Sequence, residues 1–190
     1  MELSQAVYVG LVGVVALLRL LELRISKRNQ QRLVERGAKK APDPRFPAMV
    51  AVHTCVLAGA AAEVVFLRRP FYPVLAAVMG ALFLAANAVR WWVIRTLGAH
   101  WNVQVMDSAS LGVVTSGPYR WVRHPNYTAV FVEMLALPLI HTAWITAIAG
   151  TIAHVWVLHG RIAAEEKVLR AEPAYRAAMA DKPRFLPFLF

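Results

Sequence analysis

The chain has 190 residues, of which 58% are hydrophobic, and its formal net charge at pH 7 is +10. Soluble domains are usually about 50% apolar. The excess here lies in blocks whose lengths are close to that of a transmembrane helix, about 20 residues. A charge of this size can indicate a nucleic-acid partner, but little aromatic and basic surface remains outside the apolar blocks, so none is predicted. The sequence predicts one all-α integral membrane domain over 1–190.

Five apolar segments predict the transmembrane helices. They span roughly 3–23, 47–67, 72–95, 127–141 and 143–160. The first segment lacks a basic start and a small-residue end, so it predicts a permanent helix and not a signal peptide. The fourth is short and contains Pro138, and a tight hairpin joins it to the fifth.

The basic residues predict the orientation. Of the 21 Lys and Arg, eight lie in 24–46, three in 95–126 and six in 161–184. By the positive-inside rule these three segments face the cytoplasm, the N-terminus lies outside, and the protein spans the cell membrane several times. The same charges are expected to contact anionic phospholipids. The order of 24–46 and the oligomeric state are left open.

Cysteine and histidine spacing predicts no metal site. Cys55 is the single cysteine, and no two histidines stand four residues apart. The chain also has no GxGxxG sequence and no Walker lysine loop, so a nucleotide-binding fold of the soluble type is not indicated.

Charged residues inside apolar helices are costly and are therefore candidates for function. Arg19 and Glu22 are three apart, which predicts an ion pair between them. His53 and Glu63 are ten apart and fall on different helix faces, so the spacing does not make them one site.

Two further polar positions lie deeper in the chain. Asn87 and Arg90 share a face, and both an interfacial anchor and a pocket wall remain open for them. Glu133 has no cation within four positions on its own helix, so its partner must come from another helix, from water or from a ligand.

The stretch 117–127, GPYRWVRHPNY, predicts a ligand-binding loop. Pro125 suits the first turn of a helix and biases His124 away from it. Arg123, His124 and the free amides after Pro125 then collect at a helix N-terminus, which favours an anion such as a carboxylate.

The aromatic residues of the same stretch add a second feature. Tyr119, Trp121 and Tyr127 are placed to flank a flat ring. The alternative is an interfacial aromatic belt with positive-inside charge.

A second charged cluster follows on the same side of the membrane. Arg161 and Glu165 are i, i+4, and Glu166 is adjacent. A solvated helix is the plain interpretation, but carboxylates here also suit a cationic ligand or ribose hydroxyls. A ligand with an adenine, a ribose, a carboxylate and a cationic centre is S-adenosylmethionine.

The stretch 117–127, followed by RIAAEEKVL at 161–169, resembles the isoprenylcysteine carboxyl methyltransferase family. These are polytopic membrane enzymes that use S-adenosylmethionine without a soluble Rossmann fold. The resemblance covers about 97–176, including LGAHWNVQV at 97–105, and implies a cofactor-binding core in 97–190, after the three transmembrane helices that the apolar segments predict in 1–96. With Gly117 and Arg161 added from the residues themselves, the predicted cofactor contacts are Gly117, Tyr119, Arg123, His124, Pro125, Tyr127, Arg161, Glu165 and Glu166.

Three N-terminal stretches, RLLELRISKRN, RGAKK and FPAMVAVH, resemble the bacterial branch of that family found beside type III polyketide synthases. That branch methylates alkylresorcinols or alkylpyrones. Ala129 replaces a family glycine, Glu172 and Pro173 replace Phe-Gly, and a second tyrosine after Tyr175 is missing. These departures place the acceptor in more doubt than the methyl donor.

The sequence thus predicts O-methylation of a lipid-like phenol or pyrone, with S-adenosylhomocysteine as product. A phenol with a pKa of about 10 needs a base, whereas a carboxylate does not. Glu133 or His124 is the candidate base, and Arg90 is the candidate group to stabilise a phenolate. The predicted acceptor contacts are Trp101, Asn102, Asn87 and Glu133, with an apolar wall from the second to fourth helices for the tail.

Four alternatives remain. The acceptor is a protein C-terminal prenylcysteine, or it is an amine headgroup as in phospholipid N-methyltransferases. Two readings of another class are a membrane transporter, motivated by the charges inside helices, and a non-catalytic scaffold that retains the motifs. A test of cofactor binding separates the enzymes from the last two.

Overall fold

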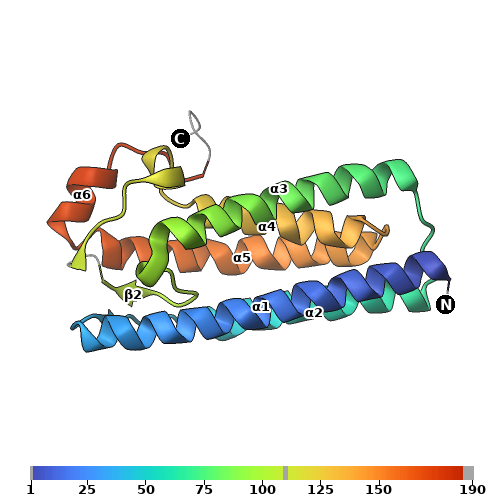
Figure 1. Ribbon diagram of the computed structural model, residues 1–190, viewed down its shortest axis with the longest axis horizontal. Coiled ribbons are helices and arrows are strands. Elements are labelled where there is room, and N and C mark those ends of the chain that lie inside the picture. Colours follow the sequence, from blue (N-terminus) through green and yellow to red (C-terminus); the bar gives the residue numbers. More distant parts are fainter. Residues whose placement is uncertain (1, 109–110, 186–190) are drawn as a thin grey trace.

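Five helices form an elongated bundle in the computed structural model, which describes residues 2–108 and 111–185 (Figure 1). They are α1 (Leu3–Glu35), α2 (Phe46–Phe66), α3 (Pro73–Leu97), α4 (Pro125–Leu139) and α5 (Trp144–Leu169). α1 and α2 lie side by side, α3 packs along α4, and α5 packs against both α2 and α4. Large apolar side chains such as Leu17, Ile152 and Trp156 stand exposed on the outer faces, as a lipid-facing surface requires.

The short elements gather at one end of the bundle, on the left in Figure 1. They are the 3-10 turns η1 (Gly98–His100) and η3 (Gly117–Arg120), helix α6 (Pro173–Met179), and strands β1 (Lys39–Lys40) and β2 (Met106–Asp107). The strands pair antiparallel, with Lys39 opposite Asp107. α1 begins at the other end of the bundle.

Within the described residues, four helices are long and apolar enough to cross a membrane: α1, α2, α3 continued through η1, and α5. The expected fourth span is helix α4, but its 15 residues rise only about 22 Å, against about 30 Å for the hydrocarbon core. The structure thus supports an integral membrane protein, and the count of five crossings remains a prediction.

Two helices extend well beyond the expected spans. α1 was expected to end near residue 23 and continues to Glu35, since 24–35 contains no glycine or proline and the turn comes at Gly37, whose φ is +93°. α5 likewise continues from the expected residue 160 to Leu169. The segment 24–46, whose order the sequence left open, is therefore mostly helix, followed by β1.

Glu63 has a structural role at the opposite end of the bundle. Its carboxylate accepts hydrogen bonds from the backbone N–H groups of Ile145 (3.1 Å) and Thr146 (2.7 Å) at the start of α5, and from Arg69. It thereby caps an N-terminus that has no partners of its own. His53 lies on another face of α2 and lines a cavity, so the two residues are separate, as expected from their spacing.

Candidate cofactor and acceptor site

A cavity of about 730 Å³ runs from the end with the short elements into the bundle. Its outer part is polar and is lined by residues of 100–127 and by α5 and α6. Its inner part is an apolar slot between α1 and α2. The slot is lined by Val9, Val12, Gly13, Ala16, Val50, Thr54, Leu57, Ala58 and Ala61.

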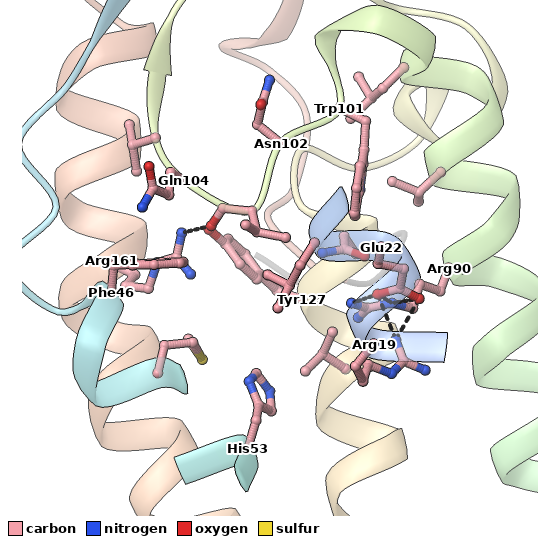
Figure 2. Close-up of a pocket in the computed structure, with 18 of the residues that line it drawn as sticks. Arg19, Glu22, Phe46, His53, Arg90, Trp101, Asn102, Gln104, Tyr127 and Arg161 are labelled. Atoms are coloured by element: carbon pink, nitrogen blue, oxygen red, sulfur yellow. Dashed lines mark hydrogen bonds and ion pairs between the residues drawn. The ribbon is translucent and has the colours of Figure 1, made fainter. Parts of the chain in front are cut away.

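The segment after α3 is held against the cavity by α1. Asn29 donates hydrogen bonds to the carbonyls of Gly98 (3.0 Å) and Trp101 (2.8 Å), and Ser26 accepts one from the N–H of Val103 (3.0 Å). Trp101 is only 2% exposed, and its ring points into the cavity (Figure 2). The next side chain, Asn102, lines the cavity with a buried Oδ1 that has no hydrogen-bond partner in the described chain.

The RHPNY loop, residues 123–127, is hydrogen-bonded to residues 183 and 184. The backbone N–H groups of Arg123 and His124 donate to the carbonyls of Pro183 (2.9 Å) and Arg184 (2.8 Å). His124 then precedes α4, which begins at Pro125 as predicted. The side chains of Arg123, His124 and Asn126 line the cavity, and the amides of Arg123 and His124 are already occupied by protein.

Glu166 is buried behind this loop and ties it to α5. Its carboxylate lies 3.1 Å from His124 Nε2, 3.3 Å from Arg123 Nη1 and 2.7 Å from Arg184 Nη2. Arg170 is a fourth partner, at 3.3 Å. Glu166 is not among the cavity-lining residues, so in this arrangement it positions the loop that contacts the ligand space.

Glu165 does line the cavity, because adjacent residues on a helix point about 100° apart. The hydroxyl of Tyr127 donates a hydrogen bond to its carboxylate. Two further phenols, Tyr119 and Tyr175, line the same region. Burial raises the pKa of Tyr175 to about 12 and raises that of Tyr119 above its ordinary value, so both phenols remain neutral at pH 7.

Arg161 joins three parts of the chain at the cavity wall. Its side chain lies at the edge of the cavity (Figure 2). Its Nη2 donates to the carbonyl of Val103 (2.7 Å) and lies 3.1 Å from the carboxylate of Asp43. Arg161 is thus partnered by Asp43 and not by Glu165, the residue four positions along its helix. Asp43 was missed by sequence reasoning because it lies in the segment between α1 and α2, far from the motifs.

A buried ion network crosses the bundle at the head of the slot. Glu22 pairs with Arg19 (2.8 Å) and with Arg90 (2.5 Å), and Arg19 Nη2 donates a hydrogen bond to the side-chain oxygen of Asn87 at 3.0 Å. Figure 2 shows Arg19, Glu22 and Arg90 of this network. Glu133 lies 3.5 Å from Arg19 and 3.6 Å from Arg90. The expected Arg19–Glu22 pair is present, and the partners of Glu133 come from other helices. Two arginines and two glutamates leave the network without net charge.

Two histidines face the cavity, the half-buried His53 and the buried His154. His53 of α2 points into it (Figure 2), and its ring centre lies 5.5 Å from that of His154 on α5. His154 is 0% exposed, and neither of its ring nitrogens has a hydrogen-bond partner in the described chain. Sequence reasoning did not pair them, because α2 and α5 are far apart along the chain.

The cavity brings most of the predicted site residues together. Those that line it are Arg90, Trp101, Asn102, Tyr119, Arg123, His124, Tyr127, Arg161 and Glu165. Those that do not are Asn87, Gly117, Pro125, Glu133 and Glu166. The second group contacts the first through ion pairs, hydrogen bonds or the backbone. Chemically, the arrangement suits a ligand with both charges and flat rings beside an apolar chain.

The sequence is similar to those of known proteins. The sequence model of the Isoprenylcysteine carboxyl methyltransferase (ICMT) family matches residues 77–171. The uncharacterized protein YpbQ of Bacillus subtilis is 30% identical over 161 residues, which are 84% of this chain and 95% of that protein. An uncharacterized protein of Haemophilus influenzae is 26% identical over 153 residues, 80% of this chain and 88% of that protein.

A solved structure has a similar fold. It is that of the eukaryotic intramembrane Ras methyltransferase ICMT, with a TM-score of 0.56 and 22% sequence identity. The match covers 69% of this chain and 48% of that chain, so this chain spans about half the length of the eukaryotic protein.

Proposed function

The chain belongs to the isoprenylcysteine carboxyl methyltransferase family, and from this premise we propose that it transfers a methyl group from S-adenosylmethionine to an oxygen of a lipophilic phenol or pyrone. The family membership makes it a membrane methyltransferase. The acceptor and the cytoplasmic orientation of the cavity in the cell membrane are parts of the proposal. The observation that carries it is a single cavity with a polar end and an apolar slot.

The residues of the polar end fit the methyl donor. Asn102 and Asn126 line the cavity with buried side-chain oxygens that have no partner in the described chain, so they are free to accept hydrogen bonds. Glu165 supplies a negative charge for an ammonium group or for ribose hydroxyls, and Arg123 supplies a positive charge for a carboxylate. Tyr119 and Tyr127 offer ring faces to an adenine. When bound, the donor provides an electrophilic methyl group on a positively charged sulfur.

The slot supports a lipid acceptor. Its walls are apolar residues of α1 and α2, whereas the sequence had suggested the second to fourth helices. A long tail lying there exchanges lipid for protein and does not have to pass through water. The tail then directs the polar head of the acceptor toward the ion network, His53 and the polar end. Alignment and exclusion of water are the main contributions of such a site.

Binding of S-adenosylhomocysteine, measured by calorimetry on detergent-purified protein, tests the cofactor part of the proposal. The wild type is expected to bind, and Glu165→Gln to bind about tenfold more weakly or worse, because a hydrogen bond to a charged group contributes about 1.5–3 kcal/mol. Glu35→Gln, an exposed glutamate at the end of α1, is the matched control. A folded wild type that does not bind S-adenosylhomocysteine would contradict this part of the proposal and favour a scaffold or a transporter.

Transfer of a labelled methyl group to a panel of acceptors tests the rest. The panel contains a long-chain alkylresorcinol, an alkylpyrone, a prenylcysteine and a phospholipid amine. Methylation of the first two supports the proposal. Methylation of the prenylcysteine or the amine alone would keep the enzyme class and overturn the acceptor.

A further inference from the structure

The groups first considered as general base are already engaged. His124 pairs with Glu166 at 3.1 Å, and Glu133 pairs with the two arginines of the ion network and does not line the cavity. Glu165 accepts the hydroxyl of Tyr127. To take a proton, His124 or Glu165 would have to give up a charge-assisted hydrogen bond, which is among the stronger polar interactions. Glu133 would lose its ion pairs with Arg19 and Arg90, at 3.5 and 3.6 Å.

His53 is differently placed. It lines the cavity from α2, its ring points into the open space, and no hydrogen bond to it is formed by the described residues. Val50, Thr54 and Leu57, which share its helix face or flank it, belong to the apolar slot. An acceptor whose tail fills the slot therefore brings its ring next to His53.

His154 supports this position from behind. It packs against His53 with the ring planes 46° apart, is fully buried, and also lines the cavity. Its two ring nitrogens have no hydrogen-bond partner in the described chain. Burying a polar group in this way costs free energy unless a ligand supplies the hydrogen bond. The pair thus has unused hydrogen-bonding capacity directed at the ligand space.

The surrounding charges suit a developing phenolate. Arg161 lies on α5 with His154, and Arg19 and Arg90 face the cavity from α1 and α3. The opposite charges are Glu22 on α1 and Glu133 on α4, both bound to those arginines. A neutral imidazole has a ring nitrogen with a free lone pair, which can accept a proton.

Resting on the proposed function, we propose that His53 is the general base of methyl transfer and that His154 is the residue that positions its ring. The O–H bond of the acceptor phenol breaks, and its proton goes to a ring nitrogen of His53. The acceptor oxygen forms a bond to the methyl carbon while the sulfur–methyl bond breaks and its electron pair stays on sulfur. The sulfonium charge is lost as His53 gains one, so the total charge is unchanged.

The test compares His53→Ala, His53→Gln and His154→Gln with the wild type, using 5-pentadecylresorcinol as acceptor between pH 6 and 10. His159→Gln, an exposed histidine of α5, is the control. Both His53 variants are expected to lose about 10²–10⁴-fold in kcat at pH 7, the usual contribution of a general base, with a smaller change in KM. Their rates should rise with pH toward the pKa of the phenol, and added imidazole should restore part of the activity of His53→Ala.

S-adenosylhomocysteine calorimetry on each variant separates a chemical role from a structural one. Affinity within about twofold of the wild type is expected, because His53 is not part of the predicted cofactor contacts. His53→Gln with wild-type kcat, or loss of cofactor binding in both His53 variants, overturns the proposal. A wild type that binds S-adenosylhomocysteine and methylates only carboxylates overturns it too, while leaving the methyltransferase function intact. A wild type that does not bind at all removes the proposed function itself.

Discussion

Gly117 was predicted to contact the cofactor, and in the structure it is instead a close-approach residue between η3 and α3. Its φ is +55°, and a Cβ built there would lie 2.5 Å from Thr96 Oγ1. Glycine alone adopts that φ readily and leaves room for the threonine. The residue therefore sets where Tyr119 and the RHPNY loop begin.

Gly117→Ala is expected to destabilise the protein by about 1–3 kcal/mol, the usual cost of a strained φ, and to weaken S-adenosylhomocysteine binding by displacing the loop. Thermal unfolding in detergent with and without the ligand measures both effects. Gly112→Ala is the control for the cost of the backbone strain alone, because Gly112 has a φ of +128° but open space around its Cβ position. Equal behaviour of the two variants would show that contact with Thr96 is unimportant.

Residue-level prediction succeeded where partners are close along the chain. Arg19 and Glu22 are three apart, and one helical turn brings them together. Arg90 also binds Glu22, but from 68 positions away, and no spacing rule encodes which helices become neighbours. The His53–His154 and Arg161–Asp43 contacts escaped the sequence for the same reason.

At the scale of elements, the last described segment of the chain is part of the site. The backbone carbonyls of Pro183 and Arg184 accept hydrogen bonds from the backbone N–H groups of Arg123 and His124. Lys182 Nζ donates a hydrogen bond to the carbonyl of Tyr119 (2.8 Å). Interaction with Glu166 raises the pKa of Arg184 above its already high ordinary value, so it remains charged at any working pH.

Truncation after Asp181 is expected to weaken S-adenosylhomocysteine binding more than tenfold, because it leaves two loop amides without partners, at about 1–3 kcal/mol for each unmet group. Arg184→Gln is the milder comparison. It removes one of three arginines around Glu166, from a side chain that is half exposed, so a loss below about threefold is expected. Calorimetry measures the affinity of both variants for S-adenosylhomocysteine. Similar losses of affinity would show that the Arg184 charge, and not the loop hydrogen bonds, accounts for the effect of the truncation.

Element existence was easier to predict than element extent. All five apolar segments are helices, since apolar runs of that length have few other solutions in a membrane. The charged continuation of α1 was missed, because hydropathy marks where lipid ends and not where a helix ends. The helical continuation of α5 beyond residue 160 was expected from the spacing of the charged residues at 161–166. β1 and β2 are two residues each, too short for any periodicity to appear.

At the scale of the whole molecule, one cavity connects a polar mouth to a slot between two membrane helices. Gly13→Leu is expected to shorten that slot, because Gly13 lines it with nothing within 4 Å of its Cβ position. KM should rise about 10- to 50-fold for a 15-carbon alkylresorcinol, as the loss of two or three buried CH₂ groups at about 0.8 kcal/mol each implies, and change little for orcinol.

Gly10→Leu is the matched control for the slot. It lies one turn earlier on α1, has the same open surroundings, and is not among the cavity-lining residues. Equal KM values for the two variants at both chain lengths would show that the slot does not hold the acceptor tail.

The orientation of the bundle ties the site to its cofactor. α2 is a candidate span of 21 residues, so the segments at its two ends, 36–45 and 67–72, lie on opposite sides of the membrane if it crosses. The first lies in the most basic part of the chain, 24–46, so the positive-inside rule predicts that it faces the cytoplasm together with the polar mouth of the cavity.

In a Cys55→Ser background, Tyr72→Cys is expected to react with a membrane-impermeant maleimide on intact cells, and Arg36→Cys only after the cells are opened. Both native residues are exposed, so accessibility to the reagent depends on the side of the membrane alone. Reaction of Arg36→Cys on intact cells would place Arg123, His124 and Glu165 outside. There a cytosolic methyl donor does not reach them, and the arrangement of charges around the cavity would need another ligand.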